Sequence, residues 1–249
     1  MKKIGSYASD IFAECQNLTH VEFPLQVTHI GHGIFFNCSN LESVTMHEGL
    51  STIGQRAFSQ CEKLKSVVLP KSIKYAGKLS FDCVQKLHSP HLFSGLPYAF
   101  FTATTSLSIK KLIVGDNAFI VPASLSSKAL STLNQRCKDG CLYKPDLSNL
   151  YQSAASTKLK QDTAYYIYKQ NPGADAELEK YLKRCAKQIA LRYIEKNKDA
   201  ELAELISFKL LSKSVLNQLL QTANETDQPS IAAYLLTQTK DKPNPKFTL

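Results

Sequence analysis

The sequence contains no apolar run long enough to cross a membrane. A membrane-spanning helix needs about 18–20 apolar residues, and none of the 249 positions begins such a run, so no membrane insertion is predicted. The first twelve residues include two lysines but lack the continuous apolar core of a signal peptide. The compartment stays open: cytoplasmic if the chain is complete, and secreted or cell-surface if a leader has been removed.

Motifs of common enzyme and metal sites are also missing. There is no GxSxG or Walker-type loop, and no CxxC or HExxH accompanies the histidines. Gly31-His32-Gly33 begins like a dinucleotide-binding loop, but Phe36 stands where the third glycine belongs. We therefore predict no catalytic, metal or cofactor site, and interpret the histidines as surface residues. They are His20, His29, His32, His47, His88 and His91.

Cysteine is present in an odd number, seven. Cys15, Cys38 and Cys61 are evenly spaced, at places where a small buried thiol packs well. Cys137 and Cys141 form a CxxxC pair, which could bridge or help to hold a metal but is weak evidence alone. We expect free thiols throughout.

What the sequence does contain is a short unit that recurs at one fixed interval, the interval from Ile30 to Ile53. "IGHGIFFNCSNLESVTM" at positions 30–46 aligns with "IGQRAFSQCEKLKSVVL" at positions 53–69. A fixed period of this length is typical of a solenoid, in which each unit stacks on the next. Three ladders of equivalent residues follow. One consists of Phe12, Phe35, Phe58 and Phe81, and another of Leu18, Leu41, Leu64 and Leu87. The third consists of Cys15, Cys38 and Cys61, followed by Val84.

Each unit combines a strand with a helical turn. The ending LxxVxΦ has the period-2 alternation of a short strand, and AFxxC places Phe and Cys on one face of a turn. The fourth copy weakens after Leu87, where "HSPHLF" replaces the apolar strand. Neither element can bury its apolar side alone, so the stacked ladder is predicted to be the folding unit.

These residues resemble the BspA-like leucine-rich repeats, whose unit is similar to I-G-x-x-A-F-x-x-C-x-x-L-x-x-V-x-I-P. The segment 53–70 matches nearly completely, lacking only the isoleucine before Pro70. The resemblance implies a curved solenoid that binds proteins or surfaces, often as an adhesin, and it implies no chemistry.

The chain after the repeats changes character. Residues 88–107 are expected to be a loop-rich connection, and Gly115-Asp116-Asn117 predicts a β-hairpin ending at Pro122, which adds to the solenoid sheet or covers its edge. Helices are predicted over 125–137, over 157–170, over 176–197 as one long helix or two short ones, and in three shorter segments beyond. Their predicted N-caps include Ser124, Asp199, Ser212 and Asp227.

The last helices resemble ankyrin-type pairs, although the T-P-L-H signature is absent. The sequence thus predicts an α+β protein in three parts: BspA-like leucine-rich repeats at 1–92, a connecting segment and hairpin cap at 93–122, and an α-helical, ankyrin-like domain at 123–249. The whole arrangement resembles that of bacterial repeat proteins.

Charge indicates a preference without naming a partner. The formal net charge is +9, with the largest excess in residues 93–160. A basic chain favours acidic partners. One helical face carries Lys180, Lys183, Arg184 and Lys187, but with Glu177 and Glu179 alongside we interpret it as a solvated face. No aromatic–basic platform accompanies it, so no nucleic-acid partner is predicted.

The predicted function is that of a non-enzymatic module for binding a protein or a surface. The candidate site is the solvent face of the repeat strands, made of His20, Glu22, Ser43, Thr45, Ser66 and Val68. The alternative is a hydrolase-type enzyme with a site in a cleft between the repeats and the helices. Because Phe12, Leu18, Val21 and Phe23 would form an uncovered apolar end, end-to-end self-association or preceding repeats are further expectations.

Overall fold

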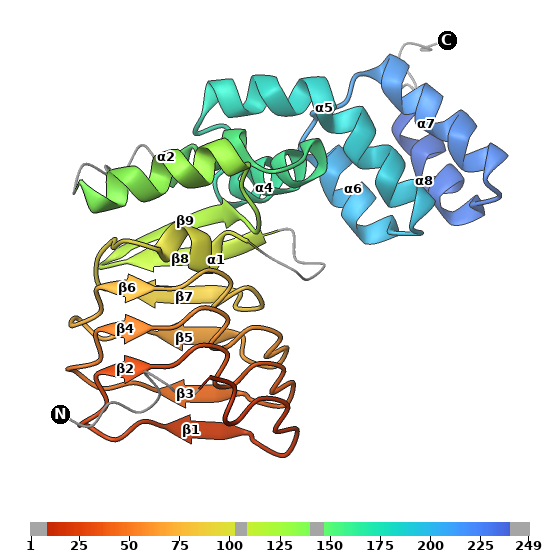
Figure 1. Ribbon diagram of the computed structural model, residues 1–249. Coiled ribbons are helices and arrows are strands. Elements are labelled where there is room, and N and C mark those ends of the chain that lie inside the picture. The colour runs from red at the N-terminus through yellow and green to blue at the C-terminus, as the bar shows by residue number, and fades with distance from the viewer. Residues whose placement is uncertain (1–8, 103–108, 140–146, 240–249) are drawn as a thin grey trace, which may run out of the picture. The chain divides into compact units, whose positions relative to one another are not determined.

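The computed structural model describes residues 9–102, 109–139 and 147–239 (Figure 1). The chain divides into two compact units, Met1–Thr163 and Ala164–Leu249. The first holds the repeats, the hairpin and the helix that follows it, and the second is helical. The division falls within the helix α4 (Thr157–Gln170), and the three-part domain organisation stays a prediction. No helix of the described chain is long and apolar enough to span a membrane.

The repeats form a β-solenoid in which equivalent strands pair in parallel. Strands β1 (His20–Glu22) and β3 (Ser43–Thr45) pair with His20 opposite Ser43, the same shift that separates Ile30 from Ile53. Strand β5 (Ser66–Val68) contacts β3 and continues the row (Figure 1). The predicted unit is therefore the physical unit of the fold.

A second row of short strands lines the other side of each coil. These strands, in chain order, pair in parallel at the same shift as β1 and β3. They are β2 (His29–Ile30), β4 (Thr52–Ile53) and β6 (Tyr75–Ala76). Each coil thus carries two strands, and the ladder residues fill the space that they enclose.

The predicted phenylalanine ladder is confirmed. The rings of Phe12, Phe35, Phe58 and Phe81 stack nearly parallel, with centroids 5.5, 5.5 and 6.0 Å apart. Phe58 and Phe81 are fully buried. Offset-stacked rings of this kind add about 0.5–1.5 kcal/mol per pair beyond the burial of their area.

Glycine is required where adjacent coils touch through their backbones. A Cβ atom on Gly54 would lie 2.5 Å from the carbonyl carbon of Gly31 in the coil before. We predict that Gly54→Ala lowers the free energy of unfolding by at least about 1–3 kcal/mol, the usual cost of overpacking, because backbone cannot move aside as a side chain can. Chemical denaturation measures the change. Gly115→Ala is the control for crowding, since its Cβ would meet nothing within 4 Å, although its φ of 55° adds strain. A loss for Gly54→Ala below that of the control would contradict the close contact.

The fourth coil differs from the prediction in register. The strand β7 (Lys86–Ser89) does form there, although "HSPHLF" was expected to replace it, and it pairs with β5 so that Leu87 lies opposite Val67. This shift is three residues shorter than the one that places Val44 opposite Val21, so three residues are missing from the coil. Leu87 is therefore equivalent to Val67 in the coil before, and not to Leu64. The predicted leucine ladder is wrong at Leu87. The register of this coil follows the backbone pairing of β7 with β5 and not the constant interval of the repeat.

The hairpin is confirmed and extends the sheet. Strand β8 (Ile109–Val114) pairs in parallel with β7, and β9 (Asn117–Pro122) returns antiparallel to it. The short helix α1 (Leu96–Phe100) lies in the preceding segment, where the Phe81 N–H donates to the Ala99 carbonyl as Phe35 does to Ala57 in an earlier coil. The connection between strands thus continues the coiled backbone.

The first described coil leaves apolar side chains in solvent. Ile11 is 55% exposed and Phe12 44% exposed. Phe23, expected at the same open end, is instead buried, with its ring edge-on to those of Phe35 and Phe58. The predicted apolar end therefore contains Phe12 but not Phe23, and self-association through it stays a prediction.

One helix, a 3₁₀ turn and the first part of a second helix complete the first unit. Helix α2 (Ser127–Lys138) is capped by Ser126, whose hydroxyl accepts from the Ala129 N–H. The prediction that Ser124 caps this helix was wrong, because Ser124 forms a β-bridge with Thr102. The turn η1 (Leu150–Ser153) precedes α4 (Thr157–Gln170), whose bounds agree with the prediction and within which the two units divide.

The second unit is built from antiparallel helix pairs. α5 contacts α6 and α7, and α8 contacts α6 and α7, so that one pair stacks on the next. This is the arrangement of a helical repeat, and the ankyrin-like label stays a prediction. The helices are α5 (Ala176–Glu195), α6 (Asp199–Ser207), α7 (Lys213–Glu225) and α8 (Pro229–Thr239).

The helix caps of this unit were predicted with mixed success. Ser212 caps α7 as expected, accepting from the Val215 N–H. Asp199 is the first residue of α6 rather than its cap, a place occupied by Lys198. Asp227 lies two residues before α8 with a φ of 53° and is not its cap. An acidic residue near a helix start favours the helix dipole without specifying which position it takes.

Candidate functional site

The predicted strand face is ordered and faces solvent. His20, Ser43 and Ser66 form one exposed row across the strands, and Glu22, the half-buried Thr45 and Val68 form the next. The His20 Nδ1 lies 2.7 Å from the Ser43 hydroxyl, and the His47 ring lies 3.4 Å from the Glu22 carboxylate. The structure thus brings the six predicted residues onto one surface, and whether this surface binds a partner stays a prediction.

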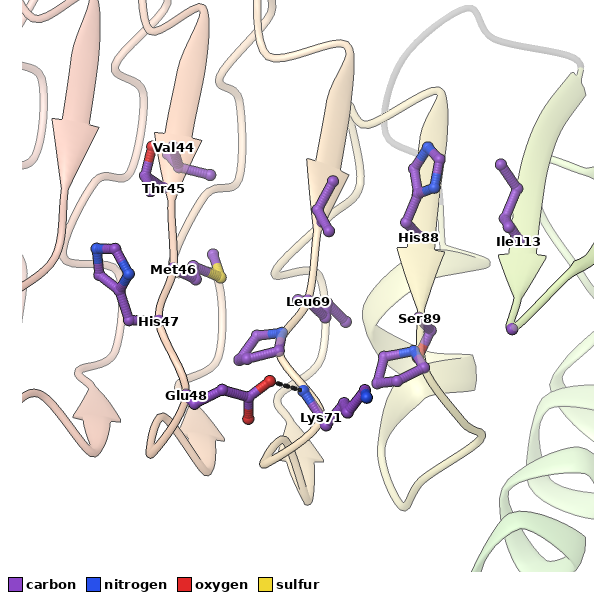
Figure 2. Close-up of a pocket in the computed structure, with 14 residues that line it drawn as sticks. Val44, Thr45, Met46, His47, Glu48, Leu69, Lys71, His88, Ser89 and Ile113 are labelled. Carbon is purple, nitrogen blue, oxygen red and sulfur yellow. Dashed lines mark hydrogen bonds between the residues drawn. The ribbon is translucent and has the colours of Figure 1, made fainter. Parts of the chain in front are cut away.

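A groove of about 700 Å³ lies along the carboxyl ends of these strands (Figure 2). Of the predicted residues, only Thr45 and Val68 line it. The floor and walls also include apolar side chains from three coils, such as Met46, Leu69 and Pro90. A concave, mostly apolar surface with a few polar groups is the usual form of a binding site.

Apart from Thr45, the polar groups of the groove come from residues that were not among the six predicted site residues. The Glu48 carboxylate accepts from the Lys71 N–H at 2.9 Å (Figure 2) and from the Ser72 N–H at 3.0 Å, and these bonds lower its pKa. The His88 pKa is lowered by burial and by the charges of Lys86 and Lys111. Had the sequence analysis predicted a strand at 86–89, the alternation of side chains along it would have placed His88 on the outward face.

A second polar cluster is sealed inside the first unit. The Lys110 ammonium donates to the Phe81 and Phe100 carbonyls at 3.0 and 2.6 Å and lies 4.5 Å from the centre of the Phe100 ring. Asp82 and Cys83 are buried nearby, and Asp82 accepts from the Ser59 hydroxyl. Burial lowers the Lys110 pKa to about 7 and raises the Cys83 pKa to about 12.

This cluster completes the fold rather than forming an open site. In earlier coils the buried thiols of Cys38 and Cys61 donate to the carbonyls of Phe12 and Phe35. Further along the ladder, Lys110 supplies the same kind of donor to the Phe81 carbonyl. A lysine at an inward strand position was the signal in the sequence, because lysine is almost never fully buried.

The cysteines of the described residues are free thiols, as predicted, whereas the absence of a metal site stays a prediction. Cys15, Cys38, Cys61, Cys83, Cys137 and Cys185 are free thiols, whereas Cys141 lies outside the described ranges. Of the residues described, no group of three or more His, Cys, Asp or Glu could hold a metal ion. The basic face of α5 is largely occupied, with Lys183 2.6 Å from Glu179 and Lys187 donating to Gln218.

The comparison with protein families agrees with the coils. The sequence model of the BspA type leucine-rich repeat region matches residues 2–124, as six copies. The N-terminal part of this chain belongs to that family. The matched repeat region extends past residue 92 and through the hairpin, as expected from the parallel pairing of β8 with β7. Leucine-rich repeats of this family typically act as protein-interaction or surface-binding modules.

Two solved structures are similar to part of the chain. The leucine-rich repeat protein of T. pallidum is 27% identical, with a TM-score of 0.28, over 35% of this chain and 52% of its own. A leucine-rich repeat protein of Bacteroides ovatus is 19% identical, with a TM-score of 0.26, over 37% of this chain and 36% of its own. The match thus spans about half or less of each relative. No curated protein matches the chain significantly.

Proposed function

We propose that this chain is a non-enzymatic protein-interaction module that binds a segment of a partner protein on the strand face of its repeat region. The observation that carries the proposal is Val68, an apolar side chain that is 62% exposed in the middle of the strand row. It lies in the wall of the groove, beside the rows of polar side chains. An exposed apolar residue on a rigid, mostly polar face is a suitable anchor for a partner.

The parallel strands support this use physically. Their backbones are held in register by hydrogen bonds, so little backbone entropy remains to be lost when a partner binds. The proposal extends the family's typical role to a particular surface. The enzyme alternative stays a hypothesis, and the buried Asp82, Cys83 and Lys110 give it no accessible site.

A displayed random-peptide library tests the proposal. Selection on the immobilised full chain should enrich sequences whose binding is lost in Ser66→Arg/Val68→Arg, because two long cationic side chains would cover the face. Tyr75→Arg is the matched control: Tyr75 is a 45% exposed apolar residue on β6, in the other sheet. Anisotropy of the enriched peptides measures affinity. Enriched peptides that bind the double variant as well as the parent would refute the strand-face site.

A further inference from the structure

Two uncompensated lysines lie on β7 and β8, the last parallel strands of the strand face. We call this part, from β5 to β8, the C-terminal end of the strand face. Lys86 on β7 lies directly opposite Lys111 on β8 in the parallel register. No ion pair or side-chain hydrogen bond joins either lysine to another described residue. Like charges on adjacent strands destabilise a sheet, so this pair does not contribute to folding.

These lysines lie next to the groove. Along β7, Lys86 precedes His88 by two residues, which places both side chains on the same face of the sheet, and His88 is opposite Val68 on one side and Ile113 on the other. Val68, His88 and Ile113 all line the groove, and Figure 2 shows His88 and Ile113 on neighbouring strands. A pair of cations therefore borders an apolar surface.

Charge is segregated along the coils. Residues 9–48 contain no lysine or arginine and five acidic residues, whereas residues 49–122 contain nine basic and three acidic residues. An acidic ligand is therefore repelled from the first coils and attracted to the later ones. Complementary charge of this kind directs a partner to one end of a surface and fixes its orientation.

We propose that the C-terminal end of the strand face binds an acidic segment of a partner protein, with carboxylates on Lys86 and Lys111 and an apolar side chain on Val68. This inference rests on the proposed function and specifies the chemistry of the partner. Adjacent strands lie about 4.8 Å apart, so an extended segment of about four or five residues crossing β5, β7 and β8 reaches all three side chains. A nucleic acid is the less favoured occupant, because Val68, His88 and Ile113 offer no tyrosine, phenylalanine or tryptophan on which its bases could stack.

Two labelled heptapeptides test the inference, one alternating glutamate and leucine and the other with glutamine in place of glutamate. At low salt we expect the acidic peptide to bind the full chain about 5- to 10-fold more tightly, the effect of two exposed ion pairs, and the difference to shrink as sodium chloride is added. Fluorescence anisotropy measures both affinities. A single-stranded oligonucleotide serves as the competing probe.

The decisive variant is Lys86→Gln/Lys111→Gln, in which the preference for glutamate should disappear. Lys74→Gln/Lys78→Gln is the control, because it removes the same charge at exposed positions near β6. Equal binding of the two peptides, a preference that survives in the decisive variant, binding of the oligonucleotide alone, or no binding of either peptide would each overturn the inference. The library selection is a separate result: strand-face peptides without acidic residues would leave the proposed function standing.

Discussion

Replacing Phe58 by alanine should lower the free energy of unfolding by about 3–5 kcal/mol. The ring is fully buried, it stacks on Phe35 and Phe81, and it also contacts Phe23 edge-on. Its removal leaves a cavity that the rigid coils on either side cannot close. Chemical denaturation, followed by a signal from the repeat region, measures the loss.

The same ladder supplies the control for this prediction. Among the described rings Phe12 stacks only on Phe35, and it is 44% exposed. Phe12→Ala therefore removes one ring contact and leaves no enclosed cavity, and we expect it to cost only about 1 kcal/mol. If both substitutions had the same small effect, stacking through the ladder would not be the main source of stability in the solenoid.

Lys110→Ala is expected to have an effect of similar size, about 3–5 kcal/mol at pH 9. It empties a fully buried site and removes the Lys110 donor from the Phe100 carbonyl, at a cost of about 1–3 kcal/mol for a buried unpaired group, whereas the Phe81 carbonyl still accepts from the Val84 N–H. Lys110→Met keeps most of the buried chain and isolates the loss of the two hydrogen bonds. Denaturation of both variants gives the two contributions.

The stabilising effect of Lys110 should grow with pH. Its pKa is about 7 in the folded chain, lowered by burial, against an ordinary value of 10.5. Between these values the unfolded chain binds more protons than the folded one, so raising the pH favours folding by up to about 1.4 kcal/mol per pH unit. Below pH 7 the lysine is charged in both the folded and the unfolded chain, so its contribution to the free energy of unfolding no longer changes with pH.

The measurement is the difference in unfolding free energy between the wild type and Lys110→Met at pH 6 and at pH 9. Groups common to both proteins cancel, and Asp82 and Cys83 are the titratable neighbours that act on Lys110. We expect the wild type to gain about 2.5–3 kcal/mol relative to the variant over this range. A difference that is constant or falls with pH would mean that the lysine keeps its ordinary pKa.

The repeat architecture could be predicted from the sequence because it depends on spacing. The interval between Phe35 and Phe58 equals the interval between Ser43 and Ser66, so any fold that stacks the one pair also aligns the other. The outward direction of Ser66 and Val68 then follows from strand alternation. The hairpin at Gly115 was equally accessible, because its turn residues mark it locally.

The positions of the polar side chains in the candidate site could not be predicted from the repeat spacing. His88 and Lys86 became strand residues only because β7 pairs with β5 after three residues are lost, and Lys111 faces Lys86 only because β8 adds to β7. Local sequence does not encode either pairing. Similarly, Ser124 and Ser126 are both good helix caps, and the bridge from Ser124 to Thr102 decided between them.

The sequence by itself determined the solenoid, its period, its aromatic ladder and the polar face of its strands, because a repeat of constant length imposes the same environment on every copy. Only the tertiary structure decided the register of the fourth coil, the burial of Lys110 against two carbonyls, and the meeting of Val68, His88 and Ile113 in one groove. These features arise where the repeat is broken. There, backbone hydrogen bonds and the need to satisfy buried polar groups fix the arrangement, and both depend on residues far apart in the chain.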